Sequence, residues 1–315
     1  MTAAMAATDF LASLERQEGR VAVVTGANSG LGFETACGLA ALGAHVILAA
    51  RNEERNASAL QALLKRVPGA KAETARLDLA SLESVAAFAE GLHARLPALD
   101  ILVNNAGVMA PPLRQETVDG FEIQFGVNHL GHFALTGRLK SLLEAGRGIV
   151  IPVASLAAVH AHIQFDDLQW RARYSPFGAY RQSKLANLLF GLELARRAKK
   201  EGWNLHARIA HPGWARTSLV SNGMAKGVSA LRAWIIDHGS AQAFRWFGQS
   251  AQAGAEPILY AIASRRARDS VYYGPDGAGE RKGPPGCAII PPSAHDPSVA
   301  RRLWEVSERL TGVAF

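Results

Sequence analysis

Residues 20–32 read RVAVVTGANSGLG, and this stretch decides the fold. Its apolar first half, residues 20–24, predicts a buried strand that runs directly into a glycine-rich turn, and a helix is expected from Phe33 to Leu42. Glycine lets the chain turn sharply and lets a diphosphate approach the backbone N–H groups at the positive end of a helix dipole. An ordinary glycine-rich turn is the alternative, since the spacing is not G-x-G-x-x-G. The position between a strand and a helix favours a dinucleotide-binding loop.

The end of the next strand bears on which dinucleotide would bind. Residues 44–50 read AHVILAA and predict a second buried strand, which ends at Arg51. At this place in dinucleotide-binding folds an acidic residue accepts a hydrogen bond from the 2′-hydroxyl of the adenosine ribose, whereas an arginine accommodates a 2′-phosphate. No carboxylate follows the strand before Glu53. NADP(H) is therefore favoured over NAD(H); the alternative is that Arg51 is one of many surface arginines in a basic chain.

Three further strands are expected to end in small or polar residues. The third ends near residues 76–79 (RLDL), the fourth opens into residues 104–107 (NNAG), and a fifth over residues 148–153 leads to Ser155. Ligands bind at the carboxyl ends of strands in open parallel sheets. Small residues at 104–107 would let an adenine or ribose lie against the backbone, and the two asparagines can bond between neighbouring strands. A serine after a strand can equally be a helix cap.

Tyr180 and Lys184 stand four residues apart in a stretch that predicts a helix. That spacing puts both side chains on one helix face, one turn apart. A phenol has an unperturbed pKa of about 10, but a nearby ammonium group favours the phenolate and lowers that pKa. The pair is a candidate proton donor and acceptor, although such a pair is more often a packed ring beside a solvated charge.

Taken in chain order, these motifs resemble those of the short-chain dehydrogenase/reductases. The resemblance covers residues 19–218 and rests on Thr25-Gly26-x-x-x-Gly30-x-Gly32, Asp78, Asn104-Asn105-Ala106-Gly107, Asn128, Ser155, Tyr180-x-x-x-Lys184 and His211-Pro212-Gly213 through Thr217. It implies an α/β protein of the Rossmann type, in which helices flank a doubly wound parallel sheet in a single domain.

The resemblance also implies a role for each matching residue. Tyr180 would be the general acid/base, Lys184 would lower its pKa and bind the nicotinamide ribose, Ser155 would bond the reacting carbonyl oxygen, and Asn128 would hold a proton-relay water. Hydride transfer to a carbonyl carbon builds negative charge on the oxygen, so such a site needs a positioned donor and a proton source. The residues expected to bind the cofactor are Gly26, Asn28, Ser29, Gly30, Leu31, Gly32, Arg51, Asp78, Leu79, Asn104, Asn105, Ala106, Gly107, Tyr180, Lys184, Pro212, Gly213, Trp214 and Thr217.

Two features depart from the commonest pattern of the family. Pro152 lies inside the expected fifth strand, where it removes a ladder donor, and Ala154 replaces a serine that often precedes the catalytic one. The interval from Ser155 to Tyr180 is 25 residues, longer than is typical of the family. The longer interval, followed by SKLAN at residues 183–187, is similar to the branch that contains retinol dehydrogenases and protochlorophyllide reductases. This similarity favours an apolar alcohol or carbonyl substrate.

Substrate choice is expected to lie beyond the motif that ends at Thr217. Residues 218–254 are rich in alanine, glycine and aromatic residues, and we expect a mobile helical lid over an apolar pocket at residues 215–254. A helix pair packed on the core or an oligomer contact is the alternative, and shallow membrane contact by Trp234 and Trp246 is another.

The chain is expected to form one domain. Its 315 residues are 49% hydrophobic, enough to bury a large core, and no linker divides them. We expect an N-terminal extension over residues 1–18, a single Rossmann domain over residues 19–315, and an ordered loop and helix over residues 274–315. In that last segment Asp296 is a candidate N-cap, and Gly312 follows the end of the helix.

Composition limits the compartment and the partners. Cys37 and Cys287 are far apart and show no metal-ligand spacing, so a reducing cytoplasm is expected and a metal site is not. No signal sequence and no run of 18 apolar residues is recognised, so neither export nor a membrane span is expected, including the N-terminal segment of many retinol dehydrogenases. The net charge of +7 suits an anionic ligand such as NADPH. The basic clusters carry no aromatic platform for bases, so nucleic acid is not expected as a partner.

These expectations converge on an NADP(H)-dependent oxidoreductase that interconverts an alcohol and an aldehyde or ketone of an apolar small molecule. Within the same family, the alternative is a steroid, polyketide or aromatic-ketone reductase. From another class, the alternative is a non-catalytic protein that senses NADP(H) or serves as a scaffold, which would not need the whole catalytic set. Relatives are often dimers or tetramers built on the helix that carries the tyrosine, so a homodimer or homotetramer is considered as well.

Overall fold

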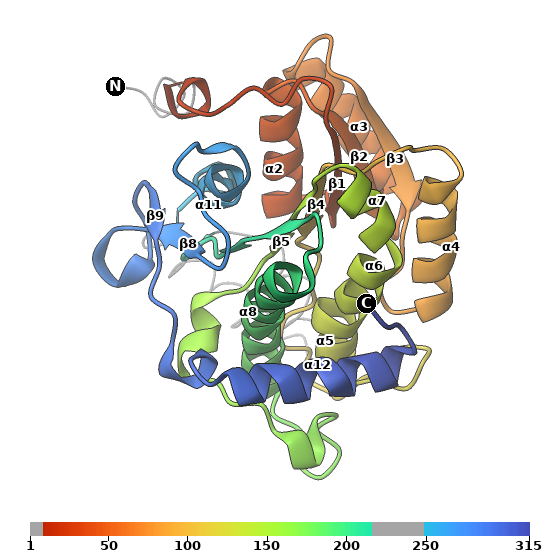
Figure 1. Ribbon diagram of the computed structural model, residues 1–315, viewed down its shortest axis with the longest axis vertical. Helices are drawn as coiled ribbons and strands as arrows, with labels where there is room; N and C mark the ends of the chain where they lie inside the picture. The colour runs from red at the N-terminus through yellow and green to blue at the C-terminus, as the bar shows by residue number, and fades with distance from the viewer. Residues whose placement is uncertain (1–8, 216–248) are drawn as a thin grey trace, which may run out of the picture.

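The computed structural model describes residues 9–215 and 249–315, and a parallel sheet lies at its centre (Figure 1). The strand order in this sheet is β3-β2-β1-β4-β5-β6. Its strands are β1 (Val21–Thr25), β2 (His45–Ala50), β3 (Ala72–Arg76), β4 (Ile101–Asn104), β5 (Ile149–Pro152) and β6 (His206–Ala207). A smaller sheet continues beyond it, made of β7 (Ile209–Ala210), β8 (Tyr272–Pro275) and β9 (Pro285–Cys287).

Helices connect the strands and cover both faces of the sheet. They are α2 (Gly30–Ala41), α3 (Glu53–Arg66), α4 (Leu82–His93), α5 (Ile123–Phe125), α6 (Gly131–Arg138), α7 (Lys140–Ala145), α8 (Pro176–Glu201), α11 (Ala251–Ala263) and α12 (Pro297–Thr311). A π-helical turn, Gly126–Leu130, joins α5 to α6. Across the described ranges, no helix has both the length and the apolar composition that crossing a bilayer requires.

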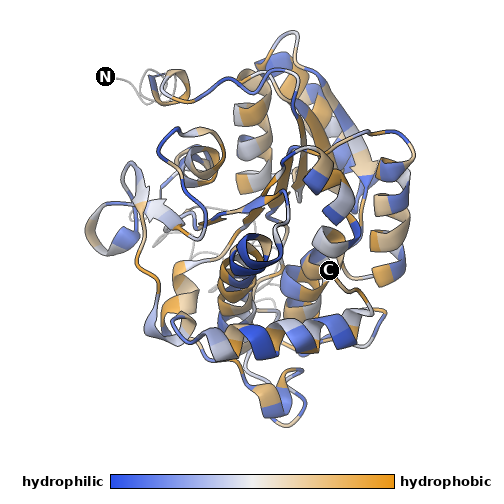
Figure 2. Ribbon diagram, viewed as in Figure 1, coloured by the Kyte–Doolittle hydropathy of each residue, from blue (hydrophilic) through white to orange (hydrophobic). Residues whose placement is uncertain are grey.

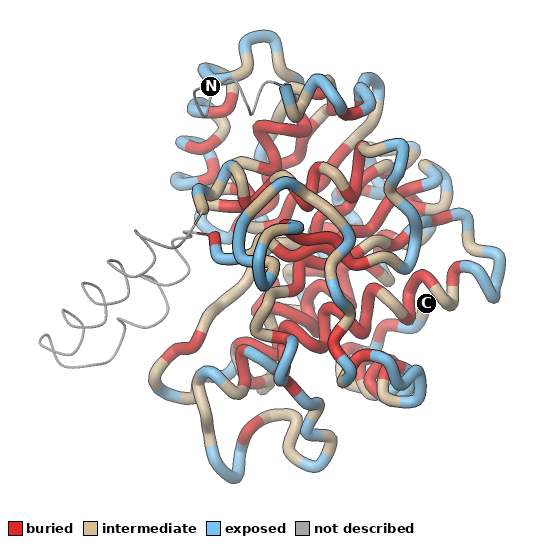
Figure 3. The backbone as a smooth tube through the Cα atoms, turned by 90° about the vertical axis from the view of Figure 1, so that its left-hand side faces the viewer, coloured by how far each residue is buried: buried red, intermediate tan, exposed pale blue. Residues whose placement is uncertain are grey.

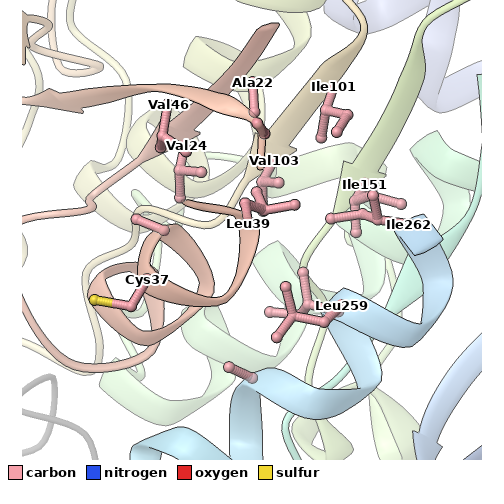
Figure 4. Packing of buried hydrophobic residues seen from close by; sticks show 14 of the residues in the cluster. Ala22, Val24, Cys37, Leu39, Val46, Ile101, Val103, Ile151, Leu259 and Ile262 are labelled. Atoms are coloured by element: carbon pink, nitrogen blue, oxygen red, sulfur yellow. The ribbon is translucent and has the colours of Figure 1, made fainter. Parts of the chain in front are cut away.

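The apolar residues of the strands fill two layers, one on each face of the sheet. Ala22 and Val24 of β1 pack on the side of α2, α3 and α11, whereas Val23 between them packs on the side of α4, α6 and α8. Side chains alternate across a strand, so an all-apolar strand can serve both layers. Figure 4 shows the first layer, with Leu259 and Ile262 of α11 facing the strands. Hydrophobic residues and buried backbone accordingly concentrate in the middle of the molecule (Figures 2 and 3).

The strand order confirms the expected doubly wound parallel sheet and places a crevice in it. From β1 the chain proceeds to β2 and β3 on one side and then crosses to β4 on the other side, so the order reverses between β1 and β4. Ligands of open α/β sheets bind at such a reversal, outside the carboxyl ends of the strands. The glycine-rich turn after β1 and residues 104–107 after β4 both lie there. The helix after β1 begins at Gly30, three residues before the expected start at Phe33, so the last two glycines of the motif, Gly30 and Gly32, lie in its first turn.

Pro152 lies within β5, as the sequence predicts, at the last position of the strand. It is in register with Asn104 of β4, and the next residue, Val153, donates its N–H to the Asn104 carbonyl at 3.0 Å. Successive backbone N–H groups of a strand face opposite neighbours, so the nitrogen of Pro152, which carries no hydrogen, faces the side of β6. On that side the ladder pairs Val150 with β6 and resumes only at Val153. The proline therefore occupies an interruption of the ladder.

Helix α12 lies across α8 (Figure 1) and packs on it. It begins and ends where the sequence predicts, because Asp296 accepts a hydrogen bond from the backbone N–H of Ser298 at 2.8 Å and Gly312 has a φ of 65°. Trp304 of α12 packs against Phe190 of α8, with ring centroids 5.7 Å apart. This side of α8 is therefore buried within the chain, and a subunit contact on the helix stays a prediction.

The described part of the expected N-terminal extension packs on the domain. The backbone N–H of Glu15 donates to the carbonyl of Ala263 at the end of α11, at 2.9 Å, and that of Gln17 donates to Leu42 after α2, at 2.8 Å. The side chain of Leu14 is buried in the layer that contains both helices. Residues 9–17 therefore tie α2 to α11 on one face of the sheet.

Candidate active site

The turn after β1 and the first residues of α2 have no room for side chains at Gly26 and Gly32. Gly26 and Gly30 have φ angles of 67° and 53°, in the left-handed region that glycine tolerates. A Cβ at Gly26 would lie 2.9 Å from the Cα of Ala106, and a Cβ at Gly32 would collide with the carbonyl oxygen of Gly26. The turn therefore lies directly against residues 104–107. Backbone N–H groups at the start of α2 can receive a diphosphate, so the residues present fit a dinucleotide.

Thr25, the last residue of β1, holds the turn that follows β4. Its Oγ1 accepts hydrogen bonds from the backbone N–H groups of Asn105 and Ala106, each at 2.9 Å, and its carbonyl oxygen accepts one from the Asn105 side chain at 2.7 Å. The predicted bond between neighbouring strands is confirmed for Asn105. It is wrong for Asn104, whose amide donates to Thr136 of α6 at 3.0 Å, because successive side chains point to opposite faces of the sheet.

Ser155, Tyr180 and Lys184 meet in one cavity of about 290 Å³. Ser155 follows β5 and caps the 3₁₀ turn Leu156–His160 by accepting a backbone N–H at 3.2 Å, so this serine is a cap as well as a lining residue. Tyr180 and Lys184 lie on α8 and are 8% and 4% exposed. The lysine Nζ lies 5.9 Å from the centre of the tyrosine ring and donates to the carbonyl of Val153 at 3.1 Å.

Burial is the largest cause of the pKa shifts of Tyr180 and Lys184. It raises the pKa of the Tyr180 phenol to about 12, an effect that a hydrogen bond with Ser155 partly offsets. It lowers the pKa of the Lys184 ammonium group to about 8. The expectation that the lysine lowers the tyrosine pKa is therefore not met in the protein alone, because removal from water disfavours the charged form of each group.

Asn128 lies in the π-helical turn and is fully buried. Its Oδ1 accepts the backbone N–H of Val108 at 2.7 Å, and its Nδ2 donates to the Val108 carbonyl at 3.0 Å and to Ser183 Oγ at 2.9 Å. A Cβ at Gly107 would lie 3.2 Å from Asn128 Oδ1 and 3.8 Å from Lys184 Nζ. Asn128 is thus close to the lysine, and its part in a proton relay stays a prediction.

The walls of the cavity are largely apolar. Phe177, three residues before Tyr180 on the same helix, was not among the expected site residues, although this spacing places both rings on one face. Their ring centroids are 6.0 Å apart. Met109 was missed as well, because it lies in an irregular segment with no pattern of its own. The lining residues are Leu31, Asn105, Met109, Val153, Ala154, Ser155, Leu156, Ala157, His160, Phe177, Tyr180, Arg181, Lys184, Pro212, Gly213, Trp214 and Ala215.

The loop after His211 forms one edge of the cavity and rests on the C-terminal segment. Gly213 has a φ of 60° and donates its N–H to His211 Nδ1 at 3.2 Å. His211 Nε2 lies 3.0 Å from the carboxylate of Glu280, and the backbone N–H of Trp214 donates to the Arg281 carbonyl at 2.8 Å. The expected ordered loop near the C-terminus thus also supports a loop of the site, a role that the sequence did not reveal.

Thr217 and most of the expected lid lie outside the described residues, which stop at Ala215 and resume at Gln249. The backbone N–H of Gln249 donates to the carbonyl of Trp214 at 2.8 Å, and its side chain donates to the carbonyl of Pro212 at 2.7 Å. The two ends of the segment therefore meet beside the cavity. The lid itself stays a prediction.

Arg51 is exposed directly after β2, at the expected adenosine end of the site. The next residue, Asn52, caps α3 by accepting the backbone N–H of Arg55 at 2.8 Å. A second hollow, of about 480 Å³, is lined by Asn28, Ser29 and Arg55 among other residues. Arg55 was not among the expected site residues. It lies in the first turn of the helix that follows Arg51, and this closeness in sequence could have pointed to it.

Asp78 and Leu79 shape the turn after β3. The Asp78 carboxylate accepts a hydrogen bond from the backbone N–H of Ala80 at 3.0 Å. The backbone N–H of Asp78 donates to Ser84 Oγ at 3.0 Å. Leu79 is buried, and a Cβ at Gly131 would lie 2.6 Å from its carbonyl oxygen. These contacts account for both residues structurally, and their contact with a cofactor stays a prediction.

Comparison with known proteins places the chain in a family. The family model described as short chain dehydrogenase matches residues 20–226. Human Retinol dehydrogenase 13 is 41% identical over 305 residues, which cover 94% of this chain and 85% of that protein. Polyprenol dehydrogenase of Mus musculus is 38% identical over 306 residues, which cover 95% of this chain and 86% of that protein.

Solved structures are also similar to this chain in sequence and fold. The structure of an uncharacterized protein from Mycobacterium paratuberculosis is 37% identical, covers 97% of this chain and 98% of its own, and has a TM-score of 0.77. A protein from Beutenbergia cavernae named as an NAD(P)-dependent gluconate 5-dehydrogenase, with bound NADP, is 26% identical. It covers 79% of this chain and 91% of its own, with a TM-score of 0.58.

Proposed function

The chain belongs to the short-chain dehydrogenase/reductase family, in the branch of the retinol dehydrogenases, and we propose that it is an NADP(H)-dependent oxidoreductase that interconverts an alcohol and an aldehyde or ketone. The observation that carries this proposal is the meeting of Ser155, Tyr180 and Lys184 in one cavity with largely apolar walls. A sensor or scaffold would need a nucleotide site, but it would have no use for two hydroxyl groups and a lysine gathered in an apolar cavity.

Ser155 and Tyr180 would act on the oxygen of the substrate, and Lys184 would act on Tyr180. A bound nicotinamide ring would supply the hydride in the reducing direction and accept it in the other. Ser155 would donate a hydrogen bond to the carbonyl oxygen, and Tyr180 would donate its phenolic proton as negative charge develops there. The ammonium group of Lys184 would stabilise the phenolate left behind. In the oxidising direction the phenolate would take the proton of the alcohol.

The two hollows of the site support a cofactor that spans the glycine-rich turn. Leu31 and Asn105 line the cavity that contains Tyr180, whereas Asn28 and Ser29 line the second hollow. The glycine-rich turn therefore borders both the cavity and the second hollow. A dinucleotide would place its diphosphate on the turn, its nicotinamide half toward Tyr180 and its adenosine half toward the second hollow.

Arg51→Asp is expected to weaken the preference for NADPH. An arginine that bonds a 2′-phosphate contributes on the order of a tenfold or greater factor in affinity, and a carboxylate in its place would repel the phosphate. We therefore expect KM for NADPH to rise by about tenfold or more, while KM for NADH changes little or falls. Arg301→Asp, at an exposed arginine of α12 that lines neither hollow, is the control with the same charge change. An unchanged NADPH preference in the Arg51 variant would contradict the assignment.

We also propose an apolar substrate. The cavity presents Leu31, Met109, Leu156, Phe177 and Trp214 around its catalytic trio. Retinol and polyprenol, named in two similar proteins, are both isoprenoid alcohols with long apolar chains. An extended apolar alcohol or aldehyde is the class that both observations support.

The proposal is tested by a panel of carbonyl compounds supplied with NADPH, followed by absorbance at the nicotinamide band. The panel contrasts isoprenoid and long-chain aldehydes with steroid ketones, aromatic ketones and short polar sugars. We expect turnover of the long apolar aldehydes at a kcat/KM at least about tenfold above that of the polar compounds. A protein that binds NADPH but reduces none of the panel, and oxidises none of the matching alcohols with NADP, would instead support a sensor.

A further inference from the structure

We propose that His132 is a positioning residue that holds the proton-transfer half and the cofactor half of the site in register, by bonding the Asn128 carbonyl with one ring nitrogen and the Thr25 hydroxyl with the other. This inference rests on the proposed function. His132 lies in the first turn of α6 and is 1% exposed. Its Nδ1 lies 2.9 Å from the Asn128 carbonyl oxygen and its Nε2 lies 2.8 Å from Thr25 Oγ1.

These partners determine where the hydrogens are. A carbonyl oxygen only accepts, so Nδ1 of His132 carries the proton and donates it to Asn128. Burial lowers the pKa of this imidazole to about 4, with the nearby Lys184 acting in the same direction, so the ring is neutral near pH 7 and Nε2 is an acceptor. Thr25 Oγ1 lies 2.8 Å from Nε2 and 3.2 Å from the Val103 carbonyl oxygen, so its single proton goes to the nearer acceptor, Nε2 of His132. The Thr25 hydroxyl oxygen remains free to accept the N–H groups of Asn105 and Ala106.

The bond to His132 therefore fixes the Thr25 hydroxyl, and that hydroxyl in turn holds the residues that border the cavity. Thr25 holds the start of residues 104–107, and Asn128 holds Val108 directly after their end. His132 bonds the Thr25 hydroxyl and the backbone carbonyl of Asn128, so the two residues that hold the ends of the turn are attached to one rigid ring, Asn128 through its main chain. Asn105 lines the cavity that contains Lys184, and a Cβ at Gly107 would lie 3.8 Å from Lys184 Nζ. A shift of the turn would therefore move the cofactor wall relative to the proton donor, and such misplacement is costly for rate.

A second histidine provides a matched control. His129 lies three residues earlier and is also 1% exposed, and burial lowers its pKa to about 3. It faces away from the cavity, because its Nε2 lies 2.9 Å from Ser307 Oγ of α12 and its ring packs on Phe125, with centroids 5.2 Å apart. The two residues are alike in burial and chemistry and differ in what they bond.

The experiment compares His132→Phe, His132→Asn and His132→Gln with His129→Phe in the full chain. For each protein, the Kd for NADPH is measured by nicotinamide fluorescence, kcat is measured with the best carbonyl substrate of the panel, and thermal stability is recorded. The asparagine amide can replace Nδ1 and keep the bond to Asn128, whereas the glutamine carbonyl can replace Nε2 and accept the Thr25 hydroxyl.

The expected pattern is a split between binding and turnover. His132→Phe should raise the Kd for NADPH and lower kcat, each by about tenfold or more. His132→Gln should recover most of the Kd but not kcat, and His132→Asn should recover kcat rather than Kd. His129→Phe should lower thermal stability by a similar amount, yet leave both quantities within about threefold of the parent.

Two results would overturn the inference. One is a His132→Phe protein whose Kd and kcat match those of His129→Phe. The other, which decides the matter if His132→Phe does not fold, is the absence of any split between the asparagine and glutamine variants. A parent protein that binds no NADPH and reduces no carbonyl compound would instead overturn the proposed function, so the two failures are distinguishable.

Discussion

A Tyr180→Phe protein is expected to bind NADPH with the affinity of the parent and to lose about a thousandfold in kcat. General acid–base catalysis by one positioned group contributes roughly 10²–10⁴ in rate, and the substitution removes only the hydroxyl that would donate the proton. The phenylalanine ring can occupy the same space on α8, beside Phe177. Ser155 keeps its capping bond to the 3₁₀ turn, so the second donor to the substrate oxygen remains in place.

Tyr174→Phe is the matched control for this prediction. Burial raises the pKa of the Tyr174 phenol to about 12, as it does for Tyr180, so the two tyrosines do not differ in charge near pH 7. The Tyr174 hydroxyl donates to the Pro111 carbonyl at 3.1 Å, outside the cavity. We expect its kcat to stay within about threefold of the parent. A Tyr180→Phe protein with the turnover of this control would refute the proposed mechanism.

Lys184→Met is expected to reduce kcat/KM by about a hundredfold or more, through weaker cofactor binding and slower chemistry together. Methionine matches the length of the lysine stem, so it fills the buried space on α8 without the charge. The variant loses the bond to the Val153 carbonyl and the cation that would stabilise the Tyr180 phenolate. Steady-state kinetics with NADPH varied at saturating substrate measure the loss. Lys140→Met, which removes a partly buried pair with Glu144 on α7 and a contact with the Trp203 ring, is the control.

The lowered pKa of Lys184 should make cofactor binding depend on pH. Burial lowers the pKa of Lys184 to about 8, so in the free protein the ammonium group loses its proton as the pH rises through that value. An anionic cofactor binds the protonated form better, so the Kd for NADPH should be constant below about pH 7 and should rise above about pH 8. Fluorescence titrations between about pH 6.5 and 9.5 test this. In Lys184→Met the rise should vanish, and a rise of equal size in that variant would assign the effect to another group.

Local patterns were sufficient for most of the fold. The apolar strands at residues 20–24 and 101–103 lie in the central sheet, the glycine-rich turn joins a strand to a helix, and Asp296 and Gly312 bound the last helix as expected. These features depend on neighbours a few residues apart, such as a cap or an alternation of side chains. The start of α2 was misplaced by three residues, because glycines were read as turn when they belong to the helix.

The candidate site was predictable as a set of residues but not as a set of contacts. Ser155, Tyr180 and Lys184 meet as expected, whereas the Asn104 side chain points to α6. Phe177 and Arg55 line the two hollows although neither residue was expected there. Side-chain direction at the end of a strand depends on which face each residue takes, and a one-residue difference reverses it.

The sequence by itself determined the order of strands and helices, the family, and the helix face shared by Tyr180 and Lys184, because each follows from spacing along the chain. Only the tertiary structure decided which atoms meet. His132 and Thr25 are bonded across 107 residues, and His211 and Glu280 across 69. The raised pKa of Tyr180 is likewise a result of burial by several elements at once. Hydrogen bonds of this kind and loss of solvent depend on packing between distant segments, which no local pattern records.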